Sequence, residues 1–251
     1  MLANDVDQYV GRSLLHYGEF SRGEAEIFEA VVQPGWRVAD VGANIGAHTL
    51  VFSRLVSQEG AVFAFEPQRL IFQMLCANLA LNNVQNVFAY QVAIGSASAT
   101  VGLHSLDMTR PNNFGAAEIH ALEGGGEKTQ IVPLEEPCNF IKIDVEGMEL
   151  EVLRGAEAMI KECRPVMYVE NDRDDKSAAL IDKIRSLGYV PRWHITMLFN
   201  PKNVRGNREN LWDGVASFNM LCLPEDCHGF ESLPVADCSH KQFIARMQGG
   251  G

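Results

Sequence analysis

Residues 38–48 read VADVGANIGAH, in which an apolar run ends near a carboxylate, Asp40, and passes directly into a turn with two glycines. Glycine allows the backbone to come close to a ligand, and the first N–H groups of a helix that follows such a turn point toward that ligand. The pattern predicts a strand, a ligand-binding turn and a helix, in that order. A plain turn, in which Gly42 and Gly46 serve only packing, is the alternative.

The residues within this turn indicate which nucleotide-like ligand it binds. A nicotinamide dinucleotide fingerprint, G-x-G-x-x-G, needs glycine where Asn44 stands, because the backbone there approaches a pyrophosphate. Asp40 adds a negative charge that opposes a diphosphate and attracts an ammonium group, such as that of S-adenosylmethionine. Glu66, at the end of the next apolar run, can accept hydrogen bonds from ribose hydroxyls in either cofactor. We therefore expect S-adenosylmethionine, with a nicotinamide cofactor as the alternative.

Short apolar runs alternate with longer amphipathic segments from residue 36 onward, which is typical of βαβ units and a parallel sheet. Two runs near the C-terminus have no helix between them and predict an antiparallel pair at one edge. The fold class is therefore α/β with a mostly parallel sheet. Predicted strands are 36–41, 61–65, 86–94, 140–145, 166–170, 189–195 and 215–223, and predicted helices are 45–57, 69–81, 150–161 and 177–187.

The length of the chain favours one domain, because α/β domains commonly run to about 250 residues. We expect this domain to span residues 1–245. It is predicted to begin with a helical segment (1–35) and to end with a disordered tail (246–251). Residues 96–137 are predicted to form an insertion, which consists of a β-hairpin (strands 100–103 and 129–134) and a flap that is rich in glycine at 124–126.

The composition narrows the possible partners and the compartment. Lys+Arg number 21 against 32 Asp+Glu, a net charge of −11, and such an acidic chain would repel nucleic acid. There is no apolar stretch of the ~20 residues needed to cross a membrane, and the acidic N-terminus does not resemble a signal peptide. The six cysteines are irregularly spaced, which indicates reduced thiols in a cytoplasmic protein and no metal site. The oligomeric state stays open, and a homodimer is possible.

A second motif, FIKIDVEGME at 140–149, carries acids at and just beyond the end of a predicted strand. Ligands of open parallel sheets bind outside the carboxyl ends of the strands, so Asp144 and Glu146 should face the same crevice as Asp40. Lys142 lies inside the strand and is expected to pair with one of these carboxylates, because a lone buried charge is costly.

Together these motifs resemble one family. DVGANIGAHTL, FEP, IKIDVEGMELEVLRGA and the upstream YGEFSRGE resemble the FkbM family of S-adenosylmethionine-dependent methyltransferases, from about Tyr17 to Asp172 and again near Asn200. The resemblance implies a Rossmann-like class I methyltransferase fold with a sheet of seven strands. It also implies an enzyme of the methyltransferase class that uses S-adenosyl-L-methionine.

The resemblance further implies positions for the cofactor. The methionine portion would lie among Asp40, Gly42, Asn44 and Gly46, the ribose on Glu66, the adenine beside Ala93, and the transferable methyl near Asp144. Tyr17 and Ser21 would touch the cofactor if the N-terminal segment forms a lid. A capping box formed by Ser21 and Glu24 at a helix start is the favoured alternative for that segment.

Known acceptors of the family are mostly hydroxyls, so we expect O-methylation of a small molecule, a sugar or another natural product; N-methylation stays open. A hydroxyl needs a base, and the candidates are Asp144, Glu146, Glu170 and His194. Crowded carboxylates should raise one another's pKa, although they could also hold a divalent ion. A packed His194 is the favoured alternative to a catalytic one. The other functions considered are an NAD(P)-dependent oxidoreductase and a non-catalytic S-adenosylmethionine-binding protein.

Overall fold

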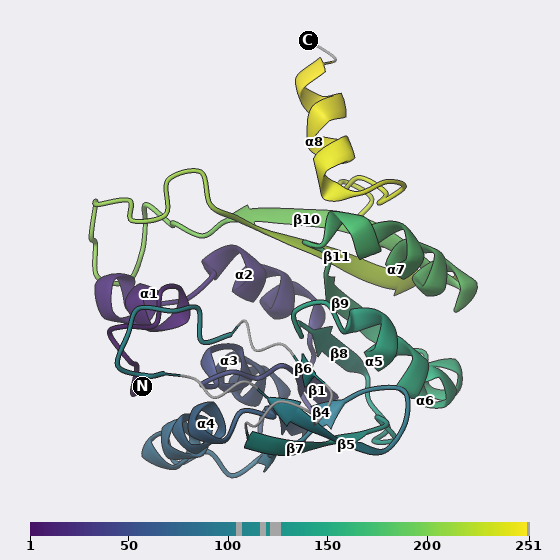
Figure 1. Ribbon diagram of the computed structural model, residues 1–251. Coiled ribbons are helices and arrows are strands. Elements are labelled where there is room, and N and C mark those ends of the chain that lie inside the picture. The colour runs from purple at the N-terminus through teal and green to yellow at the C-terminus, as the bar shows by residue number, and fades with distance from the viewer. Residues whose placement is uncertain (104–106, 116–118, 121–126, 250–251) are drawn as a thin grey trace.

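The computed structural model describes residues 1–103, 107–115, 119–120 and 127–249, and its core is a sheet of seven strands (Figure 1). The strand order is β10-β11-β9-β8-β1-β2-β3. Strand β11 is antiparallel to both of its neighbours, β10 and β9, and all other neighbouring pairs are parallel. The predicted fold class and antiparallel edge are therefore confirmed. The strands are β1 (Arg37–Val41), β2 (Ala61–Phe65), β3 (Val87–Tyr90), β8 (Phe140–Ile143), β9 (Val166–Glu170), β10 (Tyr189–Met197) and β11 (Ala216–Pro224).

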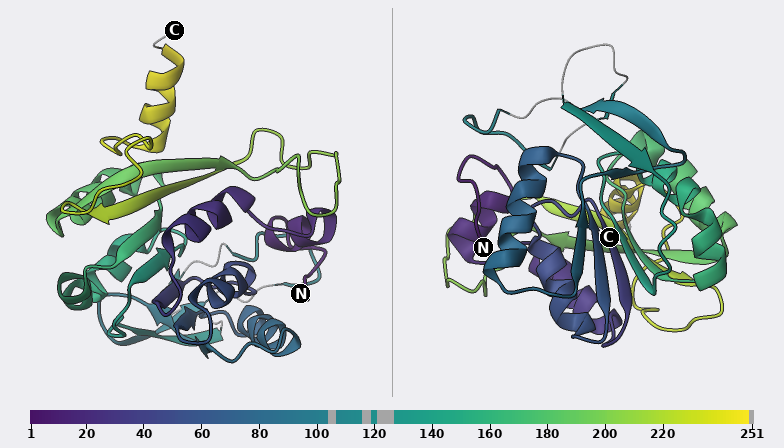
Figure 2. Two further views of the ribbon diagram at one scale, coloured as in Figure 1. Left: turned by 180° about the vertical axis from the view of Figure 1, so that it is seen from behind. Right: turned by 90° about the horizontal axis from the view of Figure 1, so that it is seen from below.

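Helices cover both faces of this sheet (Figure 2). On one face, Phe28 and Phe52 pack on Val38, Phe140 and other strand residues. On the other face, helix and strand side chains such as Val152 and Ile141 share a second core. Because β1, β2, β8 and β9 are buried on both faces, they consist largely of apolar residues, as parallel strands usually do. The first face carries α2 (Arg22–Val31), α3 (Ala47–Val56) and α4 (Arg69–Leu81), and the second carries α5 (Glu149–Gly155), α6 (Glu157–Cys163) and α7 (Asp174–Ser186).

The insertion forms a second, four-stranded sheet. Strands β5 (Ala99–Leu103) and β7 (Glu127–Val132) are antiparallel, as a hairpin between 100–103 and 129–134 would require. They are joined by β6 (Ile119–His120) and β4 (Ala93–Ile94). The predicted single strand 86–94 is wrong, because the chain leaves the main sheet after Tyr90 and pairs with β7 from Ala93. Residues 124–126 of the predicted flap lie outside the described residues.

Three helical segments differ from the prediction. The predicted helix 150–161 is divided at Ala156 into α5 and α6. Helix α8 (His240–Gly249) runs into the predicted disordered tail, because Phe243 packs beside Trp193 with ring centroids 6.2 Å apart. The N-terminal segment holds α1 (Val10–Tyr17) and α2, and α2 lies between α3 and the β10–β11 pair (Figure 1). The predicted capping box does not form there, since the Ser21 side chain bonds no helix N–H.

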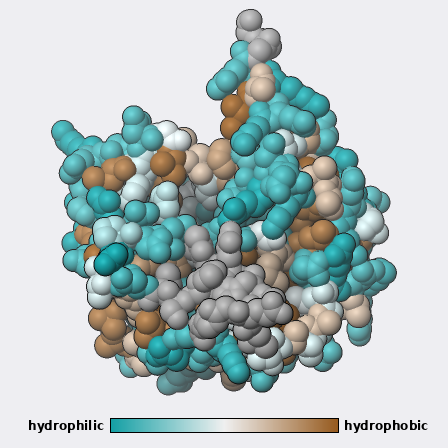
Figure 3. Space-filling view, in the orientation of Figure 1, coloured by the Kyte–Doolittle hydropathy of each residue, from teal (hydrophilic) through white to brown (hydrophobic). Residues whose placement is uncertain are grey.

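The surface of the molecule is largely polar on the side drawn in Figure 3. The face in Figure 3 is mainly hydrophilic, with apolar residues in scattered patches and α8 projecting from the body. Within the described part of the chain, no helix combines the length and the apolar character that crossing a membrane requires.

Candidate active site

The turn between β1 and α3 depends on its glycines. Gly42 has φ of +82°, and a Cβ built there would lie 1.8 Å from the Asp144 carbonyl oxygen. Gly46 has φ of +90° and is the N-cap of α3. Between them, Asn44 also takes a positive φ of +49°, and its Oδ1 accepts a hydrogen bond from the Ile45 N–H at 2.7 Å. The glycines therefore let β1 and β8 approach each other closely under the turn.

Two adjoining cavities open at the carboxyl ends of the central strands. The larger has a volume of about 310 Å³ and the smaller about 40 Å³. Gly42, Glu66, Gly115 and Asp144 line both, so these residues mark the junction. The larger cavity is lined by Tyr9, Val10, Phe20, Glu24, Gly42, Ala43, Asn44, Ala47, His48, Glu66, Asn113, Gly115, Lys142, Asp144, Glu146, Glu170, Asp172, Leu198, Val215, Ala216 and Ser217.

Glu66 is held rigidly at this junction. Its Oε2 accepts a hydrogen bond from the Asn44 N–H at 3.0 Å, and its Oε1 accepts one from the Gln68 N–H at 2.9 Å. Burial raises the pKa of Glu66 to about 7, although these two N–H groups oppose the shift. Each carboxylate oxygen keeps a further lone pair, so the side chain can accept two more hydrogen bonds from a ligand.

The smaller cavity is mainly apolar. Val92 and Ala93 contribute to its wall, together with Phe65 and Met148 from other elements. The predicted adenine-bordering residue Ala93 therefore lies beside Glu66. A flat apolar group adjacent to two hydrogen-bond acceptors is what this arrangement can hold.

Asp40, predicted to contact the cofactor, is fully buried and does not line either cavity. Its Oδ2 accepts a hydrogen bond from Thr49 Oγ1 at 2.7 Å, and its Oδ1 lies 3.5 Å from Lys142 Nζ. Side chains alternate along a strand, and Asp40 points to the face that α3 covers. Asp40 therefore lies outside both cavities and beside the Lys142 ammonium.

Lys142 connects Asp40 to the cavity. Its Nζ lies 3.0 Å from Asp144 Oδ2 and donates a hydrogen bond to the Gly42 carbonyl at 3.3 Å. Burial opposes ionisation of Asp144, but the Lys142 ammonium outweighs it and lowers the pKa of this carboxyl. The predicted pairing of Lys142 is confirmed, and the predicted rise in pKa from crowding is wrong for Asp144.

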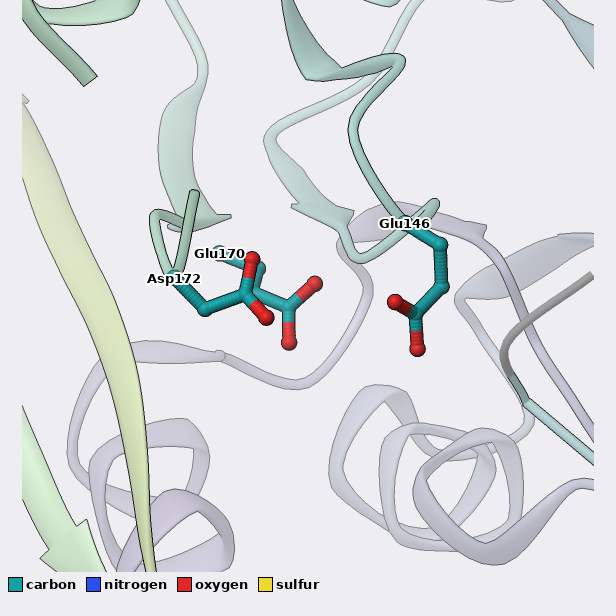
Figure 4. A group of neighbouring side chains, drawn as sticks. All are labelled: Glu146, Glu170 and Asp172. Atoms are coloured by element: carbon teal, nitrogen blue, oxygen red, sulfur yellow. The ribbon is translucent and has the colours of Figure 1, made fainter. Parts of the chain in front are cut away.

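Three further acids meet at the ends of β8 and β9 (Figure 4). Glu146, Glu170 and Asp172 each place a carboxylate oxygen within 4.8 Å of the others. Burial raises the pKa of Glu170 well above its ordinary value, and the charges of Asp144 and Asp172 add to this. Burial also raises the pKa of Glu146, whose Oε2 accepts a hydrogen bond from Arg173 at 2.9 Å. Such a group can accept a proton near neutral pH or bind a divalent cation.

Besides Asp40, four of the predicted site residues line neither cavity, namely Tyr17, Ser21, Gly46 and His194. Tyr17 is buried, and its hydroxyl donates to the Glu209 carbonyl and accepts from the Leu211 N–H. Ser21 donates to Glu24 Oε1 at 2.7 Å. His194 Nδ1 is hydrogen-bonded to the Tyr168 hydroxyl at 2.8 Å, and burial lowers the pKa of its ring. His194 lines neither cavity, and its contact with Tyr168 supports the packed role.

The sequence prediction missed cavity residues that come from distant segments. Glu24, from α2, accepts a hydrogen bond at 2.6 Å from Ser217 of β11 and lines the larger cavity with it. His48 also lines the cavity; burial lowers its pKa to about 4, so its ring is neutral. Gly115 lines the cavity as well, and the residue before it is held by a hydrogen bond that Gln68 Nε2 donates to the Phe114 carbonyl at 2.8 Å. Two of these residues have a signal in the sequence, since the spacing S-x-x-E at Glu24 predicts a helix cap and the motif 38–48 includes His48.

Two features define a class I methyltransferase fold. The sheet has an antiparallel strand inserted next to its edge, and the glycine turn after β1 faces an acid, Glu66, at the end of the next strand. The solved precorrin-6y C5,15-methyltransferase from Geobacter metallireducens is similar, with a TM-score of 0.52, 13% sequence identity, and coverage of 80% of this chain and 86% of that one. A profile of the methyltransferase FkbM domain matches residues 40–191. The chain belongs to the FkbM methyltransferase family.

Two curated relatives are named as methyltransferases. Methyltransferase 1 of Beauveria bassiana is 29% identical over 145 residues, covering 48% of this chain and 58% of that protein. Hexuronic acid methyltransferase AglP of Haloferax volcanii is 28% identical over 142 residues, covering 53% of this chain and 56% of that protein. The matched region thus spans somewhat more than half the length of each relative.

Proposed function

We propose that this protein is an S-adenosylmethionine-dependent methyltransferase that methylates a hydroxyl group of a small molecule, a sugar or another natural product. The observation that carries the proposal is Glu66 at the junction of the two cavities, with both carboxylate oxygens oriented by backbone N–H groups. Adenosine joined to an amino acid presents two ribose hydroxyls between an apolar base and a polar chain. The two cavities offer matching surroundings in the same order, with apolar walls in the smaller one, Glu66 at the junction and polar side chains in the larger one.

The residues present fit such a cofactor. Val92 and Ala93 would border the adenine in the small apolar cavity, and Glu66 would accept the ribose hydroxyls. The backbone of Gly42 and Asn44 would lie along the methionine portion, since both residues line the larger cavity. Asp40 acts at a distance in this proposal, as a positioning residue for Lys142.

When bound, S-adenosylmethionine supplies an electrophilic methyl group on a sulfonium. The residues of the chain then have two tasks, to align the acceptor and to remove its hydroxyl proton. Asp144 lies at the cavity junction and is kept ionised by Lys142, so it can orient the hydroxyl. Glu170 is the proposed base, because its pKa is raised and its buried Oε2 has no hydrogen-bond partner among the described residues.

Cofactor binding is tested by calorimetry with S-adenosylhomocysteine, NAD and NADP. We expect S-adenosylhomocysteine to bind, and Glu66→Gln to weaken it at least tenfold, about 1.4 kcal/mol, since one charge-assisted contact is lost. Glu59→Gln, at an exposed acid, is the matched control and should change nothing. Binding of NAD without S-adenosylhomocysteine would instead favour an oxidoreductase.

Turnover is tested with methyl-labelled cofactor and a library of hydroxyl-bearing acceptors. The library includes sugars, because the Haloferax relative is named a hexuronic acid methyltransferase. Glu170→Gln should lower kcat by roughly 10²-fold or more while leaving S-adenosylhomocysteine affinity nearly unchanged. Activity that is lost with a chelator and restored by Mg²⁺ would assign the three acids to a metal ion. Binding without any turnover would favour a non-catalytic protein.

A further inference from the structure

The larger cavity has a one-sided charge. Among its described lining residues, six are acidic, and Lys142 is the only one with an ammonium or guanidinium group. The Lys142 ammonium is already engaged by Asp144 at 3.0 Å and Asp40 at 3.5 Å. A carboxylate or phosphate on the acceptor would therefore meet acidic side chains and no available cation, which is unfavourable in a buried site. The six acids are Glu24, Glu66, Asp144, Glu146, Glu170 and Asp172.

Glu24 offers a carboxylate oxygen to a ligand in this cavity. The residue is only 4% exposed, and its Oε1 accepts hydrogen bonds from Ser21 Oγ at 2.7 Å and Ser217 Oγ at 2.6 Å. Its Oε2 has no hydrogen bond within the described residues, and the nearest basic atom is His48 Nδ1 at 3.9 Å. The His48 ring is neutral and supplies no compensating charge. An oxygen that makes no bond within the protein can accept a hydrogen bond from an ammonium group of a ligand in the cavity.

The cavity wall near α1 and β11 is apolar. Val10, Phe20, Leu198 and Val215 line it, together with the aromatic ring of Tyr9. This wall and the acids lie around the same space, so a ligand can bury a ring against one and place a charged group on the other. Aromatic side chains also favour cations near their faces.

We infer that the methyl acceptor carries a basic amine on an apolar or aromatic body, and that Glu24 binds its ammonium group. The inference rests on the proposed function, because it names the acceptor class of the same cavity. Glu24 belongs to α2 and the proposed base, Glu170, to β9, so in this inference different residues bind the ammonium group and take the hydroxyl proton. Anionic acceptors such as uronic acids are disfavoured.

Three probes of the same shape test the charge preference. Tyramine, tyrosol and 4-hydroxyphenylacetate share a phenol ring and differ in a terminal ammonium, hydroxyl or carboxylate. Each is titrated by calorimetry into the protein saturated with S-adenosylhomocysteine. We expect tyramine to bind at least tenfold more tightly than 4-hydroxyphenylacetate, with tyrosol between them. Equal affinities, a reversed order, or no tyramine binding at millimolar concentrations would each overturn the inference.

Variants then locate the ammonium. Glu24→Gln keeps an oxygen for the two serine hydroxyls and removes the charge, so tyramine affinity should fall at least fivefold while tyrosol affinity stays constant. Glu26→Gln, on the exposed side of the same helix, is the control. If Glu24→Gln weakens S-adenosylhomocysteine and leaves tyramine unchanged, Glu24 holds the cofactor ammonium and the inference is wrong. Failure of S-adenosylhomocysteine to bind the unaltered protein would contradict the proposed function separately.

Discussion

Lys142 determines the charge of the site at the scale of single residues. It is 3% exposed, and its ammonium lies between Asp40 and Asp144 and under the Gly42 carbonyl. The two carboxylates raise the pKa of Lys142 in spite of its burial. The lysine therefore stays charged, keeps Asp144 ionised and fixes the turn that carries Asn44. A buried charge of this kind matters most when one partner is removed.

Replacement of this lysine should be costly. Lys142→Met leaves Asp40 buried without a cation, so we expect a loss of about 3–5 kcal/mol in the free energy of unfolding, measured with urea. The variant Asp40→Asn combined with Lys142→Met should recover part of that loss. Lys161→Met, which removes an exposed pair with Glu157, should cost under about 1 kcal/mol. Equal losses for both lysine variants would contradict the central role of Lys142.

The pKa of Glu66, about 7, makes cofactor binding depend on pH. Ribose hydroxyls donate to the ionised carboxylate, so affinity is complete above this pKa and falls as the pH drops below it, by up to about tenfold per pH unit. We expect S-adenosylhomocysteine to bind more weakly at about pH 6 than at about pH 8. In Glu66→Gln the affinity should be lower throughout and nearly independent of pH over this range. A wild-type affinity that rises on acidification would contradict the assignment.

At the scale of elements, the site is formed where β1, β2, β8 and β9 end, since parallel strands bring their carboxyl ends to one edge. The turn after β1 could be predicted because its glycines and Asn44 follow directly from the sequence. The break between β3 and β4 could not, because residues 86–94 are mostly apolar and contain no glycine or proline to mark it. Only pairing of Ala93 with β7, a long-range contact, turns the chain away from the main sheet.

Gly42 allows a test of the β1 turn. Gly42→Ala places a Cβ against the Asp144 carbonyl and forces a non-glycine residue to φ of +82°. We expect destabilisation above about 2 kcal/mol by thermal or urea unfolding, and loss of S-adenosylhomocysteine binding. Gly35→Ala is a matched control, because φ there is +81° and nothing lies within 4 Å. It should cost only about 1–2 kcal/mol, the penalty of the backbone alone, and leave binding unchanged.

At the scale of the whole molecule, the cavity combines segments that are distant in the chain. Asp144, Glu146 and Glu170 could be placed together from the sequence because each follows a parallel strand. The apolar wall and Glu24 could not, because they depend on how α1 and α2 pack against the β10–β11 pair. Asp40 lies outside both cavities because the alternation of side chains along β1 directs it toward α3. A sequence motif predicts where a strand ends, but it does not predict toward which face of the sheet a given side chain points.

These distant segments should respond together to a ligand. Tyr17, Glu24 and their partners connect the N-terminal helices to the segment 199–217 through hydrogen bonds, and Leu198 and Ser217 line the cavity. A ligand that binds only the closed arrangement slows hydrogen exchange in every segment whose opening disrupts the cavity, by about a hundredfold at roughly 100 times Kd. With saturating S-adenosylhomocysteine we expect slower exchange at 42–46, 66–68 and 198–217, and no change in α6, which contributes no cavity residue. Protection confined to 42–46 would show that the cofactor does not couple the two ends of the chain.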